Sequence, residues 1–176
     1  MLRLLVPAAA LALIAAVLPP EPAGDETARA KELLKRFEGA WITETVYGNF
    51  PPSQGSEEVK LMSHGLSAVV TSSSPMGPGM TFEGHGLLGY DPAQKKWIQC
   101  WIDNTDTSVG VSEGAWSADG KVFTIEEEID MGGGPKPTLL ETRFADDGSH
   151  SFRMIAKDAA ADAKPMLTMT YKRKTP

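Results

Sequence analysis

The stretch FEGHGLLGYDPAQKKWIQCWIDN, from Phe82 to Asn104, predicts a β-hairpin. Two runs of alternating side chains flank the pair Asp91-Pro92, in which the aspartate caps a turn and the proline presets φ at its own position. Successive side chains of a strand point to opposite faces, so the second run has an aliphatic face and an aromatic, polar face. The aliphatic face carries Ile98, Cys100 and Ile102, and the other face carries Trp97, Gln99, Trp101 and Asp103.

The same texture continues from Trp41 to the C-terminus. Segments of roughly seven to ten residues alternate with breaks that contain Gly, Pro, Asn or Asp, and no helical pattern lies between them. Without helical crossovers the sheet is expected to be antiparallel, and closing it into a barrel hides its edges. The predicted fold class is all-β, an antiparallel up-and-down barrel of about ten strands. The strands are expected near residues 40–47, 57–63, 66–72, 81–90, 96–103, 107–117, 121–129, 138–145, 149–157 and 166–173.

A short helix is expected before the first strand. The sequence GDETARAKELLKRF has acidic residues early and Lys35-Arg36 late, which matches the helix dipole. Asp25 or Thr27 is expected to cap the helix, and Gly39 to end it. Helix and strands together form one expected domain over residues 25–176, long enough to bury about two-thirds of its unfolded-chain surface.

The N-terminus is typical of a secretory signal peptide. Arg3 supplies a positive charge, and the apolar run over residues 4–18 is about 15 residues long, shorter than the ~20 that a membrane span requires. Ala23-Gly24 offers a cleavage site after the prolines. We expect a signal peptide over residues 1–24, a secreted or periplasmic location and no transmembrane span in the mature chain; the alternative is an uncleaved anchor.

The composition argues against several classes of partner. The formal net charge is −6 and the isoelectric point is near 5.1. No basic stripe occurs, so no nucleic-acid partner is expected. Cys100 is the single cysteine, which rules out an internal disulfide. His64, His85 and His150 lie in separate segments without ligand spacing, so no metal and no cofactor is expected. The oligomeric state is left open.

The sequence Gly39-Ala40-Trp41 follows the predicted helix and opens the first strand. This Gly-x-Trp resembles the first-strand signature of lipocalins and related calycin barrels. In those folds the tryptophan closes the base of the barrel, and a basic residue of the last strand packs over it. The resemblance implies that Trp41 and Arg173 have this closing role.

A longer resemblance joins the helix, the Gly-x-Trp, a pattern F-x-G-x-G-x-x-G-Y-D and a W-x-D strand. In these features the chain resembles an uncharacterised secreted family, domain-of-unknown-function family 1579. The resemblance implies a calycin-like barrel and implies no activity. The matching residues are Phe82, Gly84, Gly86, Gly89, Tyr90, Asp91, Trp101 and Asp103.

The hairpin also offers a candidate polar pocket. With Tyr90 paired to Lys96, His85 would face Trp101, and Glu83 would face a second acid. Two facing carboxylates repel unless a proton or a cation lies between them, and such a pair suits acid–base chemistry. The pattern favours the simpler interpretation that this face is solvated exterior, and a slip of one residue would change every pairing. The ligand-binding candidates are Glu83, His85, Trp97, Gln99, Trp101 and Asp103.

Three functions remain open. A barrel of this size can hold a small apolar or amphiphilic molecule, which is the function we expect. An enzyme would use the group of Glu83, His85 and Asp103, although no catalytic residue is assigned and an enzyme is the less favoured alternative. An envelope protein that acts through its surface would have a barrel filled by side chains. The acidic run of residues 126–130 is interpreted as a solvated face.

Overall fold

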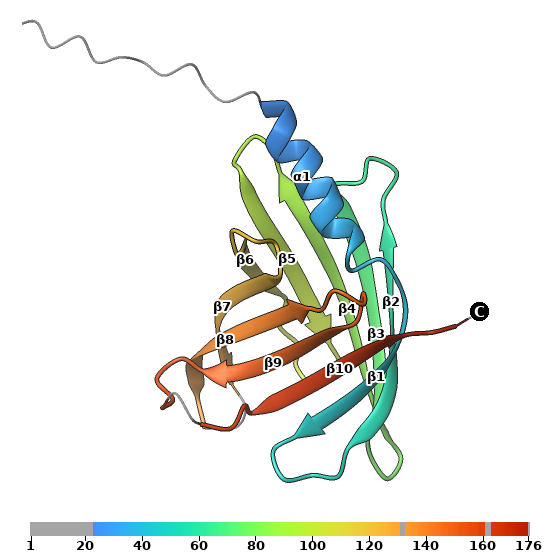
Figure 1. Ribbon diagram of the computed structural model, residues 1–176. Helices are drawn as coiled ribbons and strands as arrows, with labels where there is room; N and C mark the ends of the chain where they lie inside the picture. Colours follow the sequence, from blue (N-terminus) through green and yellow to red (C-terminus); the bar gives the residue numbers. More distant parts are fainter. Residues whose placement is uncertain (1–22, 131–132, 161–162, 176) are drawn as a thin grey trace, which may run out of the picture.

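The computed structural model describes residues 23–130, 133–160 and 163–175, which form one helix and ten strands. Each strand pairs antiparallel with the next, and β1 also pairs with β10, so the sheet closes into a barrel (Figure 1). The predicted up-and-down barrel is confirmed. The elements are α1 Ala23–Lys35, β1 Gly39–Tyr47, β2 Ser53–Leu61, β3 Ser67–Gly77, β4 Met80–Asp91, β5 Lys96–Asp103, β6 Gly110–Trp116, β7 Val122–Asp130, β8 Pro135–Phe144, β9 His150–Ala156 and β10 Leu167–Arg173.

Several element ends differ from the prediction. β2 begins at Ser53, β3 continues to Gly77 and β8 begins at Pro135, so parts of three expected turns belong to strands. Glycine, proline and serine predicted turns from local preference, but pairing with a neighbouring strand decides where a strand ends. Because α1 already includes Ala23, Asp25 lies inside its first turn and does not cap it. Thr27 lies still farther inside the helix and does not cap it either.

The predicted signal peptide, residues 1–24, lies outside the described residues except for Ala23 and Gly24, which belong to α1. In the part of the chain that the structure describes, no helix has the length and apolar character needed to cross a membrane. The signal peptide and the location therefore stay predictions.

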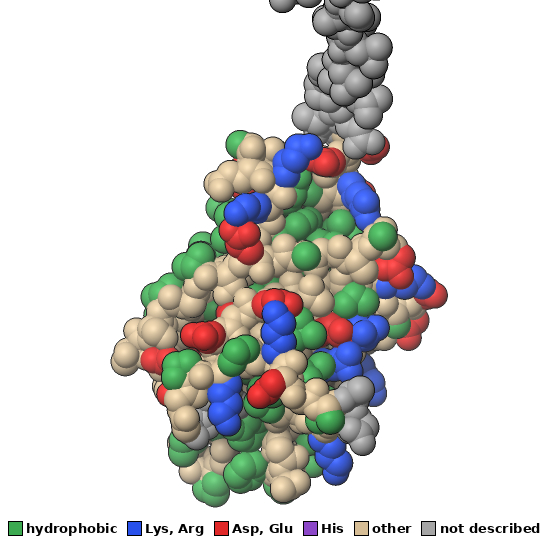
Figure 2. Space-filling view, turned by 90° about the vertical axis from the view of Figure 1, so that its left-hand side faces the viewer, with side chains coloured by type: hydrophobic (Ala, Val, Ile, Leu, Met, Phe, Trp, Pro, Cys, Tyr) green, Lys and Arg blue, Asp and Glu red, His purple; other side chains and the backbone are tan. Residues whose placement is uncertain are grey.

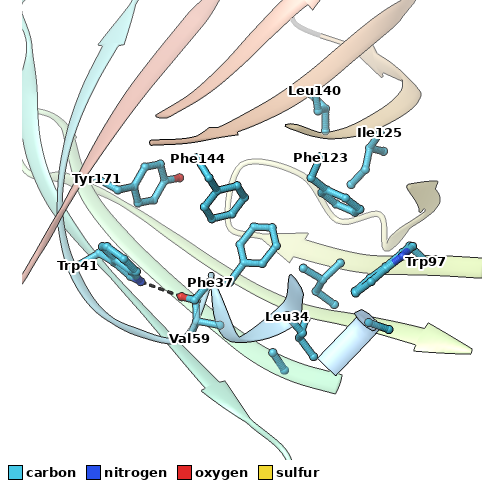
Figure 3. Close-up of a cluster of buried hydrophobic side chains, with 13 residues drawn as sticks. Leu34, Phe37, Trp41, Val59, Trp97, Phe123, Ile125, Leu140, Phe144 and Tyr171 are labelled. Carbon is cyan, nitrogen blue, oxygen red and sulfur yellow. Dashed lines mark hydrogen bonds between the residues drawn. The ribbon is translucent and has the colours of Figure 1, made fainter. Parts of the chain in front are cut away.

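Helix α1 covers one end of the barrel (Figure 1). Ala30 and Leu34 of α1 are buried, and so is Phe37 in the turn that directly follows the helix. Their spacing of four and three residues forms one apolar face, as expected for a helix that packs on a core. Figure 3 shows Leu34 and Phe37 pointing among inward-facing aromatic side chains, and the Phe37 ring lies edge-on to Phe144 at 4.8 Å and to Phe123 at 5.9 Å between centroids. We call this region the closed end.

Polar contacts fasten α1 to the closed end. Trp41 Nε1 donates a hydrogen bond to the carbonyl oxygen of Phe37 at 2.9 Å (Figure 3). Arg29 and Arg36 donate to carbonyl oxygens in the turn between β6 and β7. The Arg173 guanidinium lies over the Trp41 ring, 4.4 Å from its centroid, which is the contact that the lipocalin resemblance implied. The helix is therefore an integral part of the barrel core.

His150 is also part of the closed end. It is 5% exposed, its ring stacks on Tyr171 at 4.1 Å, and it lies edge-on to Trp41 at 4.5 Å. Burial and the nearby charge of Arg173 lower the pKa of His150 to about 3. His150 is therefore a neutral aromatic residue of the core near pH 7.

Candidate functional site

The inward-facing side chains differ along the length of the barrel. Most of those at the closed end are buried, whereas many of those farther from α1 keep part of their surface open to solvent. Most of these partly exposed residues lie two or four positions from a buried residue of the same strand, and Ser112 is paired with Gln99, which places them on the inner wall. We call this region the open half. Its partly exposed inward-facing residues include Thr45, Gln99, Trp101, Ser112, Glu127, Phe152, Met154 and Met169.

Trp101 lies against the backbone of β4 in the open half. A Cβ atom at Gly84 would come within 2.3 Å of the indole ring, and one at Gly86 within 2.7 Å, so glycine is required at both positions. The indole Nε1 donates to Asp103 Oδ2 at 3.0 Å, and Asp103 Oδ1 accepts from the Thr105 backbone N–H at 2.8 Å. The F-x-G-x-G and W-x-D patterns therefore form one structural unit that fixes the Trp101 ring.

The turn of this hairpin sets a register that differs from the predicted one. Asp91, not Tyr90, pairs with Lys96. Asp91 Oδ1 accepts the backbone N–H of Ala93 at 2.8 Å, and Lys95 takes a left-handed φ of 55°. The turn therefore has four residues between the paired positions, and the strands are shifted by one residue relative to the prediction.

This shift separates the predicted ligand-binding candidates. Glu83 and His85 point outward and are exposed, while Asp103 points inward. The predicted facing pairs are wrong, because Trp101 lies opposite Gly86 and Asp103 lies opposite glycine as well. The interpretation of a solvated exterior is wrong for the β5 face, which points into the barrel. The candidates on the inner wall are Trp97, Gln99, Trp101 and Asp103.

Glu57 on β2 is an inward-facing acid that the sequence reasoning missed. It shares its face of the strand with Val59, which is 2% exposed. Burial raises the pKa of Glu57 to about 7, and a hydrogen bond with the Tyr171 hydroxyl partly opposes this rise. Burial and the Glu57 charge raise the pKa of Tyr171 well above its ordinary value. Near neutral pH, Glu57 is therefore present in both its protonated and its ionised form, whereas Tyr171 stays protonated.

Two threonine hydroxyls of β1 lie on the same wall. Thr43 is fully buried and pairs across the sheet with Tyr171 on one side and Gly55 on the other. Within the described chain, the Oγ1 atoms of Thr43 and Thr45 have no hydrogen-bond partner. A buried polar atom without a partner costs roughly 1–3 kcal/mol, so these hydroxyls call for a partner from outside the protein chain. A Cβ at Gly55 would lie 2.9 Å from Thr43 Oγ1, so glycine keeps the space beside this hydroxyl open.

Glu127 lies on the opposite wall, because β7 is five strands from β2 in either direction around the barrel. The Ser112 hydroxyl donates to Glu127 Oε2, and Ser112 is paired with Gln99 on β5. The sequence predicts a solvated face for the acidic run around Glu127. That prediction is confirmed for the exposed Glu126 and Glu128 and is wrong for Glu127, which points inward.

Comparison with known proteins places the chain in a family. A family match covers residues 26–173. The chain belongs to the family described as "Protein of unknown function (DUF1579)". The resemblance that the glycine-rich hairpin indicated is thereby confirmed. No curated protein matches the chain. A redesigned beta barrel of known structure is similar, with 13% identity and a TM-score of 0.44 over 81% of this chain and 96% of that one.

The outer surface of this DUF1579 protein has hollows too. One of about 570 Å³ lies between α1 and the turn that joins β2 to β3, and its lining mixes acidic and basic side chains such as Glu32 and Lys31. In the described parts of the chain, no group of three or more His, Cys, Asp or Glu is placed to hold a metal ion. The interior is the stronger candidate site, because the unpartnered buried side-chain atoms found among the described residues belong to inward-facing Thr43, Thr45, Trp116 and His150.

Proposed function

We propose that this DUF1579 protein binds a small amphiphilic molecule in the open half of its barrel. The observation that carries the proposal is the hydroxyl of the fully buried Thr43, which has no hydrogen-bond partner among the described residues, in an interior that also exposes apolar side chains such as Trp101 and Met169. Ligand sites combine a mostly apolar lining with a few polar groups that orient the ligand. The open half has this composition, and the packed closed end does not.

The alternative of a barrel filled by its own side chains fits only the closed end. There Phe37, Phe123 and Trp116 pack ring against ring. In the open half, Trp101 and Phe152 remain partly exposed although they point inward. Covering such apolar surface is favourable by about 25 cal/mol for each Å² removed from water. A ligand with an apolar part would gain this free energy on entering.

An enzyme would have to use residues other than the predicted group of Glu83, His85 and Asp103. Glu83 and His85 point outward and Asp103 inward, so the predicted catalytic group does not converge. The pair of Glu57 and Tyr171 favours a second candidate function, proton transfer to a bound molecule, because a base with a pKa near the working pH is the most effective. Chemical conversion of a bound molecule by the wild-type protein, but not by Glu57→Gln, would support this candidate. Mass spectrometry of the recovered molecule measures it.

The binding proposal is tested with three probes of equal chain length: 1-octanol, octanoate and octylamine. We expect at least one to bind with a stoichiometry of one per barrel and to change the tryptophan fluorescence. Trp101→Ala should weaken that binding by about 1–3 kcal/mol, the scale for burying one large apolar side chain. Ile102→Ala is the matched control, since Ile102 is the next residue, points outward and is 43% exposed. Failure of all three probes, or equal effects of the two variants, would reject the proposal.

We also propose that the protein acts after export, in the periplasm or outside the cell. The support is the sequence alone, namely Arg3 followed by the apolar run of residues 4–18. Intact-mass analysis of the protein from its native host should find a chain that starts near residue 25. A full-length cytosolic species would contradict export.

A further inference from the structure

We infer that the ligand of the open half carries a protonated amine. The inference rests on the proposed function and names the chemical group that the inner wall is suited to recognise. Its basis is the inner wall. Its described residues present carboxylates and hydroxyls, which are acceptors for a cation, and carry basic side chains only at the two ends of the barrel.

The inward-facing charged residues of the described strands are unevenly placed. The acids Glu57, Asp103 and Glu127 line the inner wall. The basic residues on the same faces, Arg173 at the closed end and Lys136 at the opposite rim, are both exposed. By contrast, the outer face drawn in Figure 2 shows acidic and basic side chains interspersed. The field inside the open half therefore favours a positive charge.

Glu141 shows how this protein treats a buried acid elsewhere. It lies on the outer wall, is 6% exposed, and accepts hydrogen bonds from Arg143 at 2.9 Å and from Arg153 at 2.6 Å. Within the described chain, neither Glu57 nor Glu127 has a Lys or Arg partner, and the hydrogen bond that Glu127 accepts comes from the uncharged Ser112 hydroxyl. Removing a carboxylate from water is costly unless a cation pairs with it. A ligand ammonium would supply the missing charge.

Thr43 points independently to a donor on the ligand. Among the described residues its fully buried Oγ1 has no hydrogen-bond partner, and Thr43 lies directly across the sheet from Tyr171. A threonine hydroxyl offers two acceptor positions, and a primary ammonium offers three donors and no acceptor. One ammonium can therefore bind a carboxylate and a hydroxyl at once, which an alcohol or a carboxylate ligand cannot do with the same strength.

The apolar part of the wall suits the rest of such a molecule. The Trp101 ring is fixed by Gly84, Gly86 and Asp103, and the face of an indole attracts organic cations. Met154 and Met169, partly exposed on the same inner wall, adapt their shape to alkyl chains. The expected ligand class is an amine with an apolar body.

The test compares octylamine, 1-octanol and octanoate by calorimetric titration of the full chain at pH 8, where Glu57 is ionised in the folded protein. We expect octylamine to bind at least about tenfold more tightly than the other two probes, a difference of about 1.4 kcal/mol. Glu57→Gln and Glu127→Gln should each remove most of this preference, measured as the ratio of the octylamine affinity to the 1-octanol affinity of the same variant. Thermal unfolding of each variant establishes that it is folded.

The matched controls are Glu58→Gln and Glu128→Gln, which remove the same charge from adjacent exposed, outward positions. They correct for general attraction of a cation to an acidic protein and should leave the preference intact. If 1-octanol or octanoate binds as tightly as octylamine, the amine inference is wrong while the proposed function stands. Equal effects of inward and outward variants would also overturn the inference. Failure of all three probes would reject the proposed function, and the inference with it.

Discussion

The two ends of the barrel interior are packed to different degrees. At the closed end, Phe37, which follows the end of α1, lies among aromatic rings, and Trp41 donates its N–H to a backbone carbonyl. In the open half, Trp101 keeps an exposed surface, and the hydroxyl of Thr45 has no partner in the described chain. Under the proposed function, the closed end stabilises the fold, and the open half presents side chains to a ligand.

The largest expected effect compares one tryptophan from each region. Trp41 is 1% exposed, so Trp41→Ala should cost about 3–5 kcal/mol of folding free energy. Trp101 is partly exposed, so Trp101→Ala should cost clearly less. Denaturant unfolding measures both. Equal losses would show that the two ends of the interior are packed alike, and would contradict the claim that the closed end is packed more tightly than the open half.

The next effect concerns the carboxyl group of Glu57. Its folded-state pKa is about 7, above the ordinary value of 4.5, so the folded state favours the protonated form. Below about pH 4.5 the group is protonated in both states and costs nothing, and as the pH rises towards 7 the penalty grows to at most about 3 kcal/mol. Glu57→Gln should therefore leave stability unchanged at pH 4 and raise it at pH 8.

Denaturant unfolding at both pH values measures this difference. The low pKa of His150 also makes stability depend on pH, but His150 is present in both proteins, so its contribution cancels. Glu58→Gln, a change at the exposed neighbour, should show no such dependence. A difference between Glu57→Gln and wild type that is the same at pH 4 and pH 8 would mean that Glu57 is not desolvated.

A smaller effect is expected at the glycines beneath Trp101. Gly84→Ala places a methyl group 2.3 Å from the ring, so the ring must move, at a cost of about 1–3 kcal/mol. At Gly110 the nearest contact of an added Cβ is 3.8 Å, so Gly110→Ala is the control and should change stability little. Thermal unfolding compares the two. An unchanged stability of Gly84→Ala would show that the Trp101 ring is not held against β4.

The smallest effect concerns the Arg173 guanidinium over Trp41. Arg173 is exposed, so Arg173→Ala should cost only about 0.5–1 kcal/mol. Lys172→Ala removes a neighbouring positive charge that points outward, and it should cost less. Denaturant midpoints measure both. A loss of several kcal/mol for Arg173→Ala would show that this one contact, and not the packing of the aromatic rings, is the main stabilising interaction at the closed end.

Much of the fold could be predicted because strand alternation and turn chemistry are local. Asp91-Pro92 marked its turn correctly, and the Gly-x-Trp at Trp41 led to the Arg173 contact through a family resemblance. The register of the hairpin could not be predicted, because it depends on whether the turn holds four or five residues between paired positions. The left-handed φ of Lys95 settles this in the structure, and one residue exchanges the inward and outward faces.

The inward acids were harder to predict than the aromatic residues. Glu57 and Glu58 are adjacent, so composition cannot tell which of them points inward. The sequence feature that could have identified Glu57 was its position two residues before the apolar Val59, because residues two apart in a strand share a face. Glu127 was hidden in the same way within an acidic run. Whether two acids lie on opposite walls depends on barrel closure, which no local pattern records.

The central claim, that a ligand enters the open half, is tested most directly by NMR of methionine methyl groups during titration with octylamine. Met154 and Met169 are on the inner wall, while Met62 lies outside the strands and is 47% exposed. We predict saturable shifts of the Met154 and Met169 methyl signals at one probe per barrel, with the Met62 signal unmoved. Unmoved Met154 and Met169 signals at saturation, or shifts confined to exposed methionines, would contradict binding in the open half.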